Sequence, residues 1–143
     1  MIHGPHGGGL FIDTGAFYAR YVARDDHHEE ALALWKTVQE KKIPCLTSNF
    51  VMAELISLLI YRFGNKSALQ AAREIYTSHA IQIIPVTLEM ELKALDWLEK
   101  YSDQAFSMTD ATSFALMEEK EIKTAFTFDH HFEVAGFEKF RKQ

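Results

Sequence analysis

The sequence contains only one cysteine, three prolines and no long uninterrupted run of apolar residues. Because Cys45 has no second cysteine, the chain can form neither an internal disulfide nor a cysteine-rich zinc site, and we expect Cys45 to pack as a small hydrophobic residue. The longest apolar stretch, residues 50–61, is interrupted by Glu54 and Ser57 and is too short to span a bilayer. No signal-like segment precedes Leu10. The sequence therefore predicts a cytoplasmic protein without a membrane segment.

Basic residues are also few, with 15 Lys and Arg against 20 Asp and Glu, giving a net charge of −5. This balance argues against a general nucleic-acid coat, because phosphate binding is driven by clustered positive charge. The negative net charge does not exclude a site that binds nucleic acid through bridging metal ions. The composition, 48% hydrophobic and 24% charged, is typical of one compact domain. We expect a flexible glycine-rich leader over residues 1–9, followed by a single domain over residues 10–143.

Strand-like and helix-like segments alternate along the chain. The β-branched and aromatic composition predicts strands at residues 10–12, 43–47, 81–86 and 124–128, with amphipathic or apolar helical spacing between them. A last short edge element is expected after residue 129. This alternation predicts a three-layer α/β/α domain with a short, mainly parallel central sheet.

The pattern also predicts which elements are buried. Pro44 cannot donate a ladder hydrogen bond, so residues 43–47 are expected to form an edge strand. The helix at residues 50–61 is apolar on all sides and is expected to be deeply buried. Helical spacing places Leu69 and Tyr76 in one later helix, and Leu92 and Leu95 in the next, on faces expected to point inward.

Four carboxylates lie at positions where side chains can converge. Asp13 directly follows the first strand, Asp129 follows the fourth, and Asp110 occupies the first turn of a helix that feeds into the fourth strand. In open parallel sheets, ligands bind beyond the carboxyl ends of the strands. Each acid alone has a structural explanation as a strand end or helix cap. Glu54, inside the apolar helix, needs either a salt bridge or a metal ion.

Four carboxylates in one crevice would repel one another and raise their pKa values unless a cation lies among them. Ligation by acidic oxygens, with water completing an octahedron, favours Mg²⁺ or Mn²⁺. Such a site supports metal-assisted phosphodiester hydrolysis, in which a metal ion lowers the pKa of the attacking water and no nucleophilic side chain is needed. One ion and two ions fit these four carboxylates equally well.

Four motifs carry a family resemblance that covers nearly the whole chain from Leu10 onward. They are FIDTGAFYA around Asp13, TSNFVMAELISLL around Glu54, FSMTDATSFALMEE around Asp110 and TFDHHFEVAGF around Asp129. In their order and spacing, the sequence resembles PIN-domain ribonucleases of the VapC type, the toxins of many toxin–antitoxin pairs. The resemblance implies a metal-dependent endoribonuclease that cuts RNA.

By this resemblance, the four acids form the catalytic, metal-binding set, and the hydroxyls of Thr14 and Thr109 support it. Gly15 departs from the pattern, because many relatives carry a small polar residue there. The resemblance further implies a homodimer whose two acidic pockets share a groove, and an antitoxin partner that inhibits the enzyme.

Charged and aromatic side chains outside the acidic set supply candidate RNA contacts. The basic residues at loop or helix ends are Arg20, Arg24, Arg62 and Lys66. His130 and His131 adjoin Asp129 and invite a general-acid role. We favour packing or substrate contact for both, because metal-bound water makes a protein acid unnecessary.

Other functions fit the same residues less well. Phosphotransferases that form an aspartyl-phosphate carry a second aspartate two residues after the first, where this chain has Gly15. Response-regulator receivers carry a lysine after a late strand, where this chain has Asp129 and two histidines. A PIN-like domain that has lost activity and serves as a protein-interaction module is the remaining alternative, and a failure to bind metal would favour it.

Overall fold

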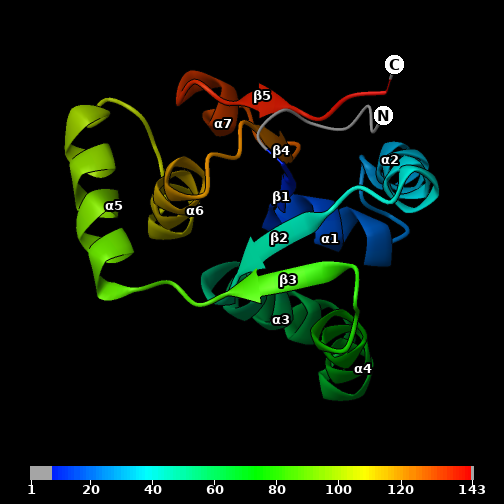
Figure 1. Ribbon diagram of the computed structural model, residues 1–143. Helices are drawn as coiled ribbons and strands as arrows, with labels where there is room; N and C mark the ends of the chain where they lie inside the picture. The colour runs from blue at the N-terminus through cyan, green and yellow to red at the C-terminus, as the bar shows by residue number, and fades with distance from the viewer. Residues whose placement is uncertain (1–7, 143) are drawn as a thin grey trace.

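A five-stranded parallel sheet forms the centre of the protein, for which a computed structural model describes residues 8–142. The strands are β1 (Leu10–Ile12), β2 (Cys45–Ser48), β3 (Ile81–Ile84), β4 (Thr124–Phe126) and β5 (Glu138–Lys139). Their order across the sheet is β3-β2-β1-β4-β5, and every neighbouring pair is parallel (Figure 1). The predicted parallel sheet is thereby confirmed. The last edge element, expected over residues 130–137, lies instead at residues 138–139, because residues 131–134 form a short helix.

The expectation that residues 43–47 form an edge strand is wrong. β2 lies inside the sheet, paired with β1 on one side and β3 on the other. Pro44 does not interfere because it precedes the strand, and its carbonyl accepts a hydrogen bond of 2.9 Å from the backbone N–H of Leu10. The proline therefore marks where β2 begins, and its missing donor costs no ladder bond.

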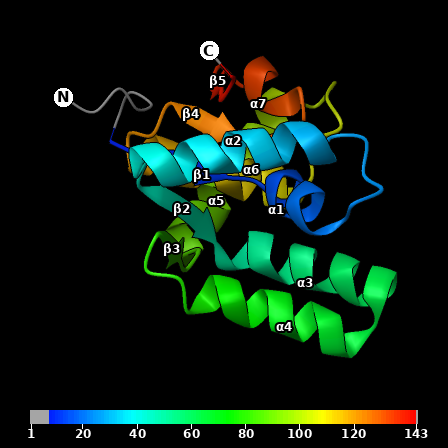
Figure 2. The same cartoon turned by 90° about the vertical axis from the view of Figure 1, so that its right-hand side faces the viewer.

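Helices cover both faces of the sheet and confirm the three-layer architecture. Figure 1 shows α1 and α2 on the side of the sheet opposite α5 and α6, and Figure 2 shows α3 and α4 as an antiparallel pair. The helices are α1 (Thr14–Tyr21), α2 (His28–Lys41), α3 (Asn49–Phe63), α4 (Asn65–Tyr76), α5 (Leu88–Lys100), α6 (Met108–Glu119) and α7 (His131–Val134). α3 packs against α1 and α6, the two helices that begin beside Asp13 and at Asp110.

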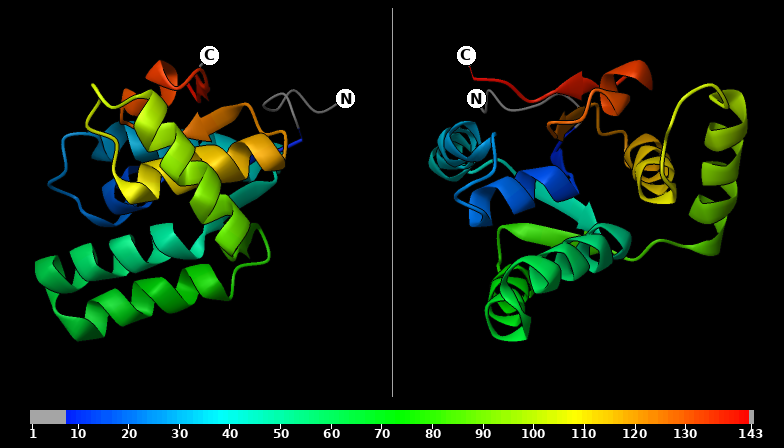
Figure 3. Two further views of the ribbon diagram at one scale, coloured as in Figure 1. Left: turned by 90° about the vertical axis from the view of Figure 1, so that its left-hand side faces the viewer. Right: turned by 180° about the vertical axis from the view of Figure 1, so that it is seen from behind.

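Three helices expose apolar side chains that were expected to be buried. In α3, Tyr61 is 92% exposed, and Leu58, Ile60 and Phe63 are also exposed, although Val51, Met52, Leu55 and Leu59 are buried. Leu69 and Tyr76 of α4, and Leu92 and Leu95 of α5, are exposed as well, which contradicts the inward orientation expected of these four side chains. Ala72 and Ile75 of α4, on the same expected face, are buried. Both views in Figure 3 show α5 outermost, with α6 between it and the sheet.

Aromatic side chains fill the core on both faces of the sheet. On the α1/α2 face, the ring of Trp35 lies 5.6 Å from that of Phe17 and 5.0 Å from that of Phe126. On the α6 face, the ring of Phe114 lies 5.0 Å from that of Phe132 and 5.1 Å from that of Phe106. These contacts hold the helices that begin at the carboxyl edge of the sheet against its central strands.

The remaining fold expectations concern Cys45 and the leader. Cys45 is buried in the core, as predicted, and burial raises the pKa of its thiol to about 12. Residues 1–7 lie outside the described residues, so the proposed leader stays a prediction there. Gly9, which we assigned to that leader, is buried, and an added Cβ would meet Leu46 Cδ1 at 2.8 Å. In residues 8–142, no helix combines the length and apolar character needed to cross a membrane.

Candidate metal centre and active site

Two of the predicted carboxylates leave adjacent strands at the same edge of the sheet. Asp13 follows β1 and is the N-cap residue of α1, and Asp129 follows β4, which pairs directly with β1. The backbone N–H of Asp13 donates a 3.0 Å hydrogen bond to the carbonyl of Phe126, which ties the two strand ends together. Adjacent parallel strands thus bring both acids to one crevice, as their positions in the sequence predicted.

Thr127 connects these two acids, although it was not among the predicted site residues. Its buried hydroxyl donates a 2.8 Å hydrogen bond to Asp13 Oδ2 and accepts a 3.0 Å hydrogen bond from the backbone N–H of Asp129. The threonine two residues before Asp129 was a signal for this turn, because a hydroxyl commonly accepts from the backbone two residues on. The hydrogen bond from Thr127 to Asp13 could be predicted only from the knowledge that β1 and β4 are neighbours.

Asp110 is the third acid, and it is held by a capping box at the start of α6. The Ser107 hydroxyl accepts a 3.0 Å hydrogen bond from the backbone N–H of Asp110, and Asp110 Oδ2 accepts one of 3.0 Å from the backbone N–H of Ser107. The helix-cap explanation and the site explanation of Asp110 therefore both apply. Its carboxylate is buried and has a fixed direction before any ligand binds.

His131 lies between the second and third acids. Its Nδ1 is 3.3 Å from Asp110 Oδ2 and 3.2 Å from Asp129 Oδ1, and its backbone N–H donates a 2.9 Å hydrogen bond to the same Asp129 oxygen. The neighbouring His130 is mostly exposed, with its Nδ1 3.7 Å from Asp129 Oδ1. Thr127 and His131 thus link Asp13, Asp129 and Asp110 into one connected group.

The electrostatics of Asp13 show that the three carboxylates interact. Burial raises the pKa of Asp13 from 3.8 to about 7, the hydrogen bond from Thr127 opposes this, and the negative charges of Asp110 and Asp129 raise the pKa further. Ionising Asp13 is therefore costly without a compensating positive charge. A divalent cation between the carboxylates would supply that charge, so the site fits a Mg²⁺ or Mn²⁺ ion by its chemistry.

A buried hydroxyl beside Asp13 gives a second indication. Thr14 Oγ1 is enclosed and, within residues 8–142, is the one fully buried side-chain polar atom without a hydrogen-bond partner. Leaving a buried hydroxyl unpaired costs about 1–3 kcal/mol. A ligand or a metal-associated water at this edge would satisfy it, as a supporting role for Thr14 requires.

The family comparison matches this geometry. The PIN-domain family profile covers residues 10–138. The chain belongs to the PIN-domain family. The predicted resemblance to VapC-type PIN domains is confirmed by similarity to VapC ribonucleases.

Relatives of this PIN domain are similar along almost their full length. The chain is 37% identical over 134 residues, 94% of this chain and 99% of the relative, to the 23S rRNA-specific endonuclease VapC20 of Mycobacterium tuberculosis. It is 32% identical over 114 residues to a VapC ribonuclease of Archaeoglobus fulgidus, covering 78% of this chain and 72% of that protein. The crystal structure of M. tuberculosis VapC20, described as a Sarcin-Ricin loop cleaving toxin, superposes with a TM-score of 0.85 at 36% identity, covering 94% of this chain and all of that one.

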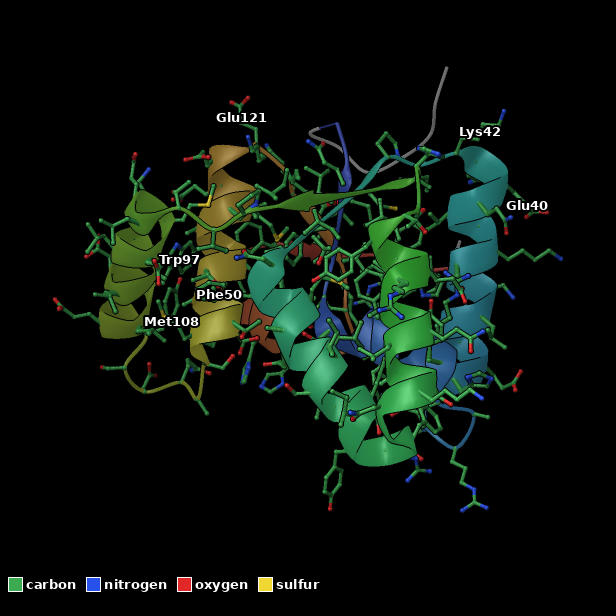
Figure 4. The ribbon with its side chains drawn as sticks, turned by 90° about the horizontal axis from the view of Figure 1, so that it is seen from below. Glu40, Lys42, Phe50, Trp97, Met108 and Glu121 are labelled. Atoms are coloured by element: carbon green, nitrogen blue, oxygen red, sulfur yellow. The ribbon has the colours of Figure 1, made fainter. Side chains whose placement is uncertain are left out.

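Glu54, the fourth predicted ligand of the PIN domain, is not joined to the other three by any hydrogen bond or ion pair in the described part of the chain. It is half-buried on the second turn of α3. α3 begins at the carboxyl edge of the sheet. Figure 4 shows Phe50, near the start of α3, directed toward α6, whose first residue is Met108. Glu54 also has no salt bridge within residues 8–142, so its role as a metal ligand stays a prediction.

The other predicted contacts of the PIN domain are not gathered at the carboxylates. The carbonyl of Thr109 accepts hydrogen bonds from Thr112 and Ser113, and no hydrogen bond of its own hydroxyl is found among the described residues. The Arg20 guanidinium lies over the Trp35 ring, 5.1 Å from its centre. Arg62 and Lys66 flank the turn between α3 and α4.

The loop that joins α1 to α2 contains one basic and two acidic residues and packs against Phe128. It carries Arg24, and the ring of His27 in the same loop stacks on Phe128 with centres 4.4 Å apart and an angle of 7°. Phe128 directly precedes Asp129. This contact holds the loop beside the carboxylate edge, and an RNA contact by Arg24 stays a prediction.

Proposed function

We propose that this chain is a metal-dependent endoribonuclease that hydrolyses RNA phosphodiester bonds and acts as the toxin of a toxin–antitoxin pair. The observation that carries the proposal is the convergence of Asp13, Asp110 and Asp129 at the carboxyl edge of the sheet, linked by Thr127 and His131. The family and the ribonuclease relatives support the same activity.

The proposed cofactor is Mg²⁺ or Mn²⁺, with one or two ions per site, held by Asp13, Asp110, Asp129 and Glu54. When bound, such an ion lowers the pKa of an attacking water and offsets charge on the phosphate. The chain positions the ligands: Thr127 orients Asp13, the capping box orients Asp110, and the His131 backbone orients Asp129. Thr14 and Thr109 support the set. The hydrogen bonds from Thr127, Ser107 and His131 fix the directions of these three carboxylates.

The proposed substrate is a structured stem-loop of large-subunit ribosomal RNA, by similarity to the M. tuberculosis endonuclease. Arg24, on the loop held beside Asp129, is the best-placed residue for contacting RNA phosphates. Arg20, Arg62 and Lys66 are proposed as more distant contacts. Action on RNA agrees with the cytoplasmic location predicted from the sequence.

A homodimer is proposed from the apolar side chains that the chain leaves exposed. Leu88, Leu92 and Leu95 form one stripe along α5, exposed by 72%, 56% and 53%. Apolar side chains at this spacing normally face a partner, and α3 adds exposed Leu58 and Tyr61. The double substitution Leu92→Glu/Leu95→Glu should convert the dimer to a monomer in light scattering, whereas Leu69→Glu on α4 should not. An unchanged mass would contradict the proposed interface.

An antitoxin partner is proposed for the second open surface. A cavity of about 850 Å³ lies between α2 and the beginnings of β2 and β3. Its lining combines apolar residues such as Leu32 and Ile43 with the basic residues Arg20, Lys36 and Lys42. An apolar segment that carries acidic residues would complement it. Copurification of a small protein encoded beside this chain would support the pairing.

The test of the activity uses purified protein freed of any partner and a panel of structured RNAs that includes the sarcin–ricin stem-loop. We expect cutting with Mg²⁺ or Mn²⁺, and none with EDTA or in Asp110→Asn. Asparagine keeps an oxygen for the Ser107 N–H, so the capping box survives while the charge is lost. Asp103→Asn, on the exposed loop before α6, is the matched control and should cut normally.

Two results would contradict the proposal. Equal cutting by Asp110→Asn and the unmodified chain would mean that these acids do not perform the reaction. If the RNA stays intact and calorimetry shows no Mn²⁺ binding, the chain is an interaction module and not a nuclease.

A further inference from the structure

His131 lies between the carboxylates of Asp110 and Asp129, where a metal ligand would lie. Its Nδ1 faces one oxygen of Asp110 at 3.3 Å and one of Asp129 at 3.2 Å. Its side chain is only 16% exposed, compared with 75% for His130. Asp129, His130 and His131 each offer a ligand atom, and these atoms lie within 4.8 Å of one another.

The ring of His131 is held in this position from two directions. His131 is the first residue of α7, and its backbone N–H is bound to Asp129 Oδ1 at 2.9 Å. The buried ring of Phe106 meets the imidazole edge-on, with centres 5.1 Å apart and an angle of 74°. A histidine that served only as a surface group would not need a fixed ring orientation.

The two distances from His131 Nδ1 match those between neighbouring ligands in a coordination shell. With metal–ligand bonds of about 2.1 Å, adjacent ligands of an octahedral ion lie roughly 3 Å apart. The two N···O distances, 3.2 Å to Asp129 and 3.3 Å to Asp110, are close to this value. His131 Nδ1 could therefore be the neighbour of either carboxylate oxygen in one shell.

We propose that His131 Nδ1 is a direct ligand of the ion held by Asp110 and Asp129, and that it gives the site a preference for Mn²⁺ over Mg²⁺. The inference rests on the proposed function, because it concerns the metal centre of that nuclease. Mg²⁺ takes oxygen ligands, whereas imidazole is an ordinary ligand of first-row transition ions. An added nitrogen therefore strengthens Mn²⁺ binding and leaves Mg²⁺ binding almost unchanged.

The decisive measurement is the affinity of the whole chain for Mn²⁺ and for Mg²⁺ by calorimetry, for the unmodified protein, His131→Gln and His79→Gln. We expect His131→Gln to weaken Mn²⁺ binding by about tenfold or more, within the range for losing a group at a metal site. The Mg²⁺ affinity should change much less. His79→Gln, at an exposed histidine outside this cluster, is the matched control and should leave both affinities unchanged. Thermal unfolding in EDTA checks that each variant folds.

A spectroscopic measurement tests the bond without relying on a variant. Electron paramagnetic resonance of the unmodified protein with Mn²⁺ should show coupling to a histidine ¹⁴N nucleus, and this coupling should be absent in His131→Gln. Equal weakening of Mn²⁺ and Mg²⁺, without nitrogen coupling, would overturn the proposal and reduce His131 to a hydrogen-bonding clamp. If this result is found and RNA is still cut, only the role of His131 as a metal ligand is refuted. A chain that binds neither ion and cuts no RNA refutes the nuclease as well.

Discussion

Replacing Asp13 with asparagine should stabilise the metal-free protein at pH 8, although it removes a catalytic group. Burial and the charges of Asp110 and Asp129 raise the pKa of Asp13 from 3.8 to about 7. Between these two values, the folded protein keeps a proton that the unfolded chain has released. The folded state therefore binds more protons, and the free energy of unfolding falls as the pH rises through this window.

The difference between 3.8 and about 7 corresponds to about 4 kcal/mol, at roughly 1.4 kcal/mol per pH unit. This amount is the upper limit of the gain, because the asparagine side chain of the variant carries no charge but must still accept the hydrogen bond from Thr127. Part of the fall in the free energy of unfolding of the unmodified protein has already occurred at pH 5. The advantage of Asp13→Asn should therefore grow by about 2–3 kcal/mol between pH 5 and pH 8.

Urea unfolding in EDTA at both pH values measures this advantage directly, with Asp103→Asn as the exposed control. Adding Mn²⁺ at pH 8 should then reverse the order, because an ion that binds only the folded state stabilises the unmodified protein. If the advantage of Asp13→Asn is the same at pH 5 and pH 8, the buried Asp13 carboxylate does not carry the electrostatic cost assigned to it.

Three further predictions concern the packing around the site. Thr127→Val removes the hydroxyl between Asp13 and Asp129 and should lower the free energy of unfolding by about 1–3 kcal/mol in urea titrations. Thr127→Ser keeps the hydroxyl, so its free energy of unfolding should fall clearly less. An equal fall in both variants would argue against the hydrogen bonds. Phe114→Ala should cost about 3–5 kcal/mol, because the buried Phe114 ring meets Phe106 and Phe132. Tyr76→Ala on the exposed face of α4, outside the proposed dimer interface, should cost little, and comparable losses would contradict the assigned burial. The Cys45 thiol is buried, and its pKa is raised to about 12. It should therefore react with a thiol reagent at pH 8 far more slowly in the native protein than in urea. Similar rates would show that Cys45 is accessible in the native protein.

The positions of Asp13, Asp110 and Asp129 were predictable because local signals determine them. A strand that stops at a carboxylate, or a serine followed three residues later by an aspartate, is readable from neighbouring residues alone. The parallel alternation of strands and helices then places strand ends at one edge. No such local signal reports whether Glu54 reaches the same crevice, since that depends on the angle at which α3 packs on α1 and α6.

The errors came from assuming that every apolar face is covered by the chain's own core. The composition of α3 was identified correctly, but its exposed Tyr61 and Leu58 lie on a face that nothing in residues 8–142 covers. Likewise, residues 43–47 were assigned to an edge strand only because Pro44 lacks an N–H. The pairing of β2 with both β1 and β3 depends on the whole topology and cannot be deduced from five residues.

The sequence by itself determined the order of the elements, the parallel sheet and the three acids that end or begin them, because hydrophobic periodicity and capping act over a few residues. Only the tertiary structure decided which side chains hold those acids. Thr127 bonds to Asp13 because β4 lies beside β1, and His131 reaches Asp110 because α7 turns back toward α6. Such contacts join residues 114 and 21 positions apart. They are set by the packing of the folded chain, and no local pattern encodes them.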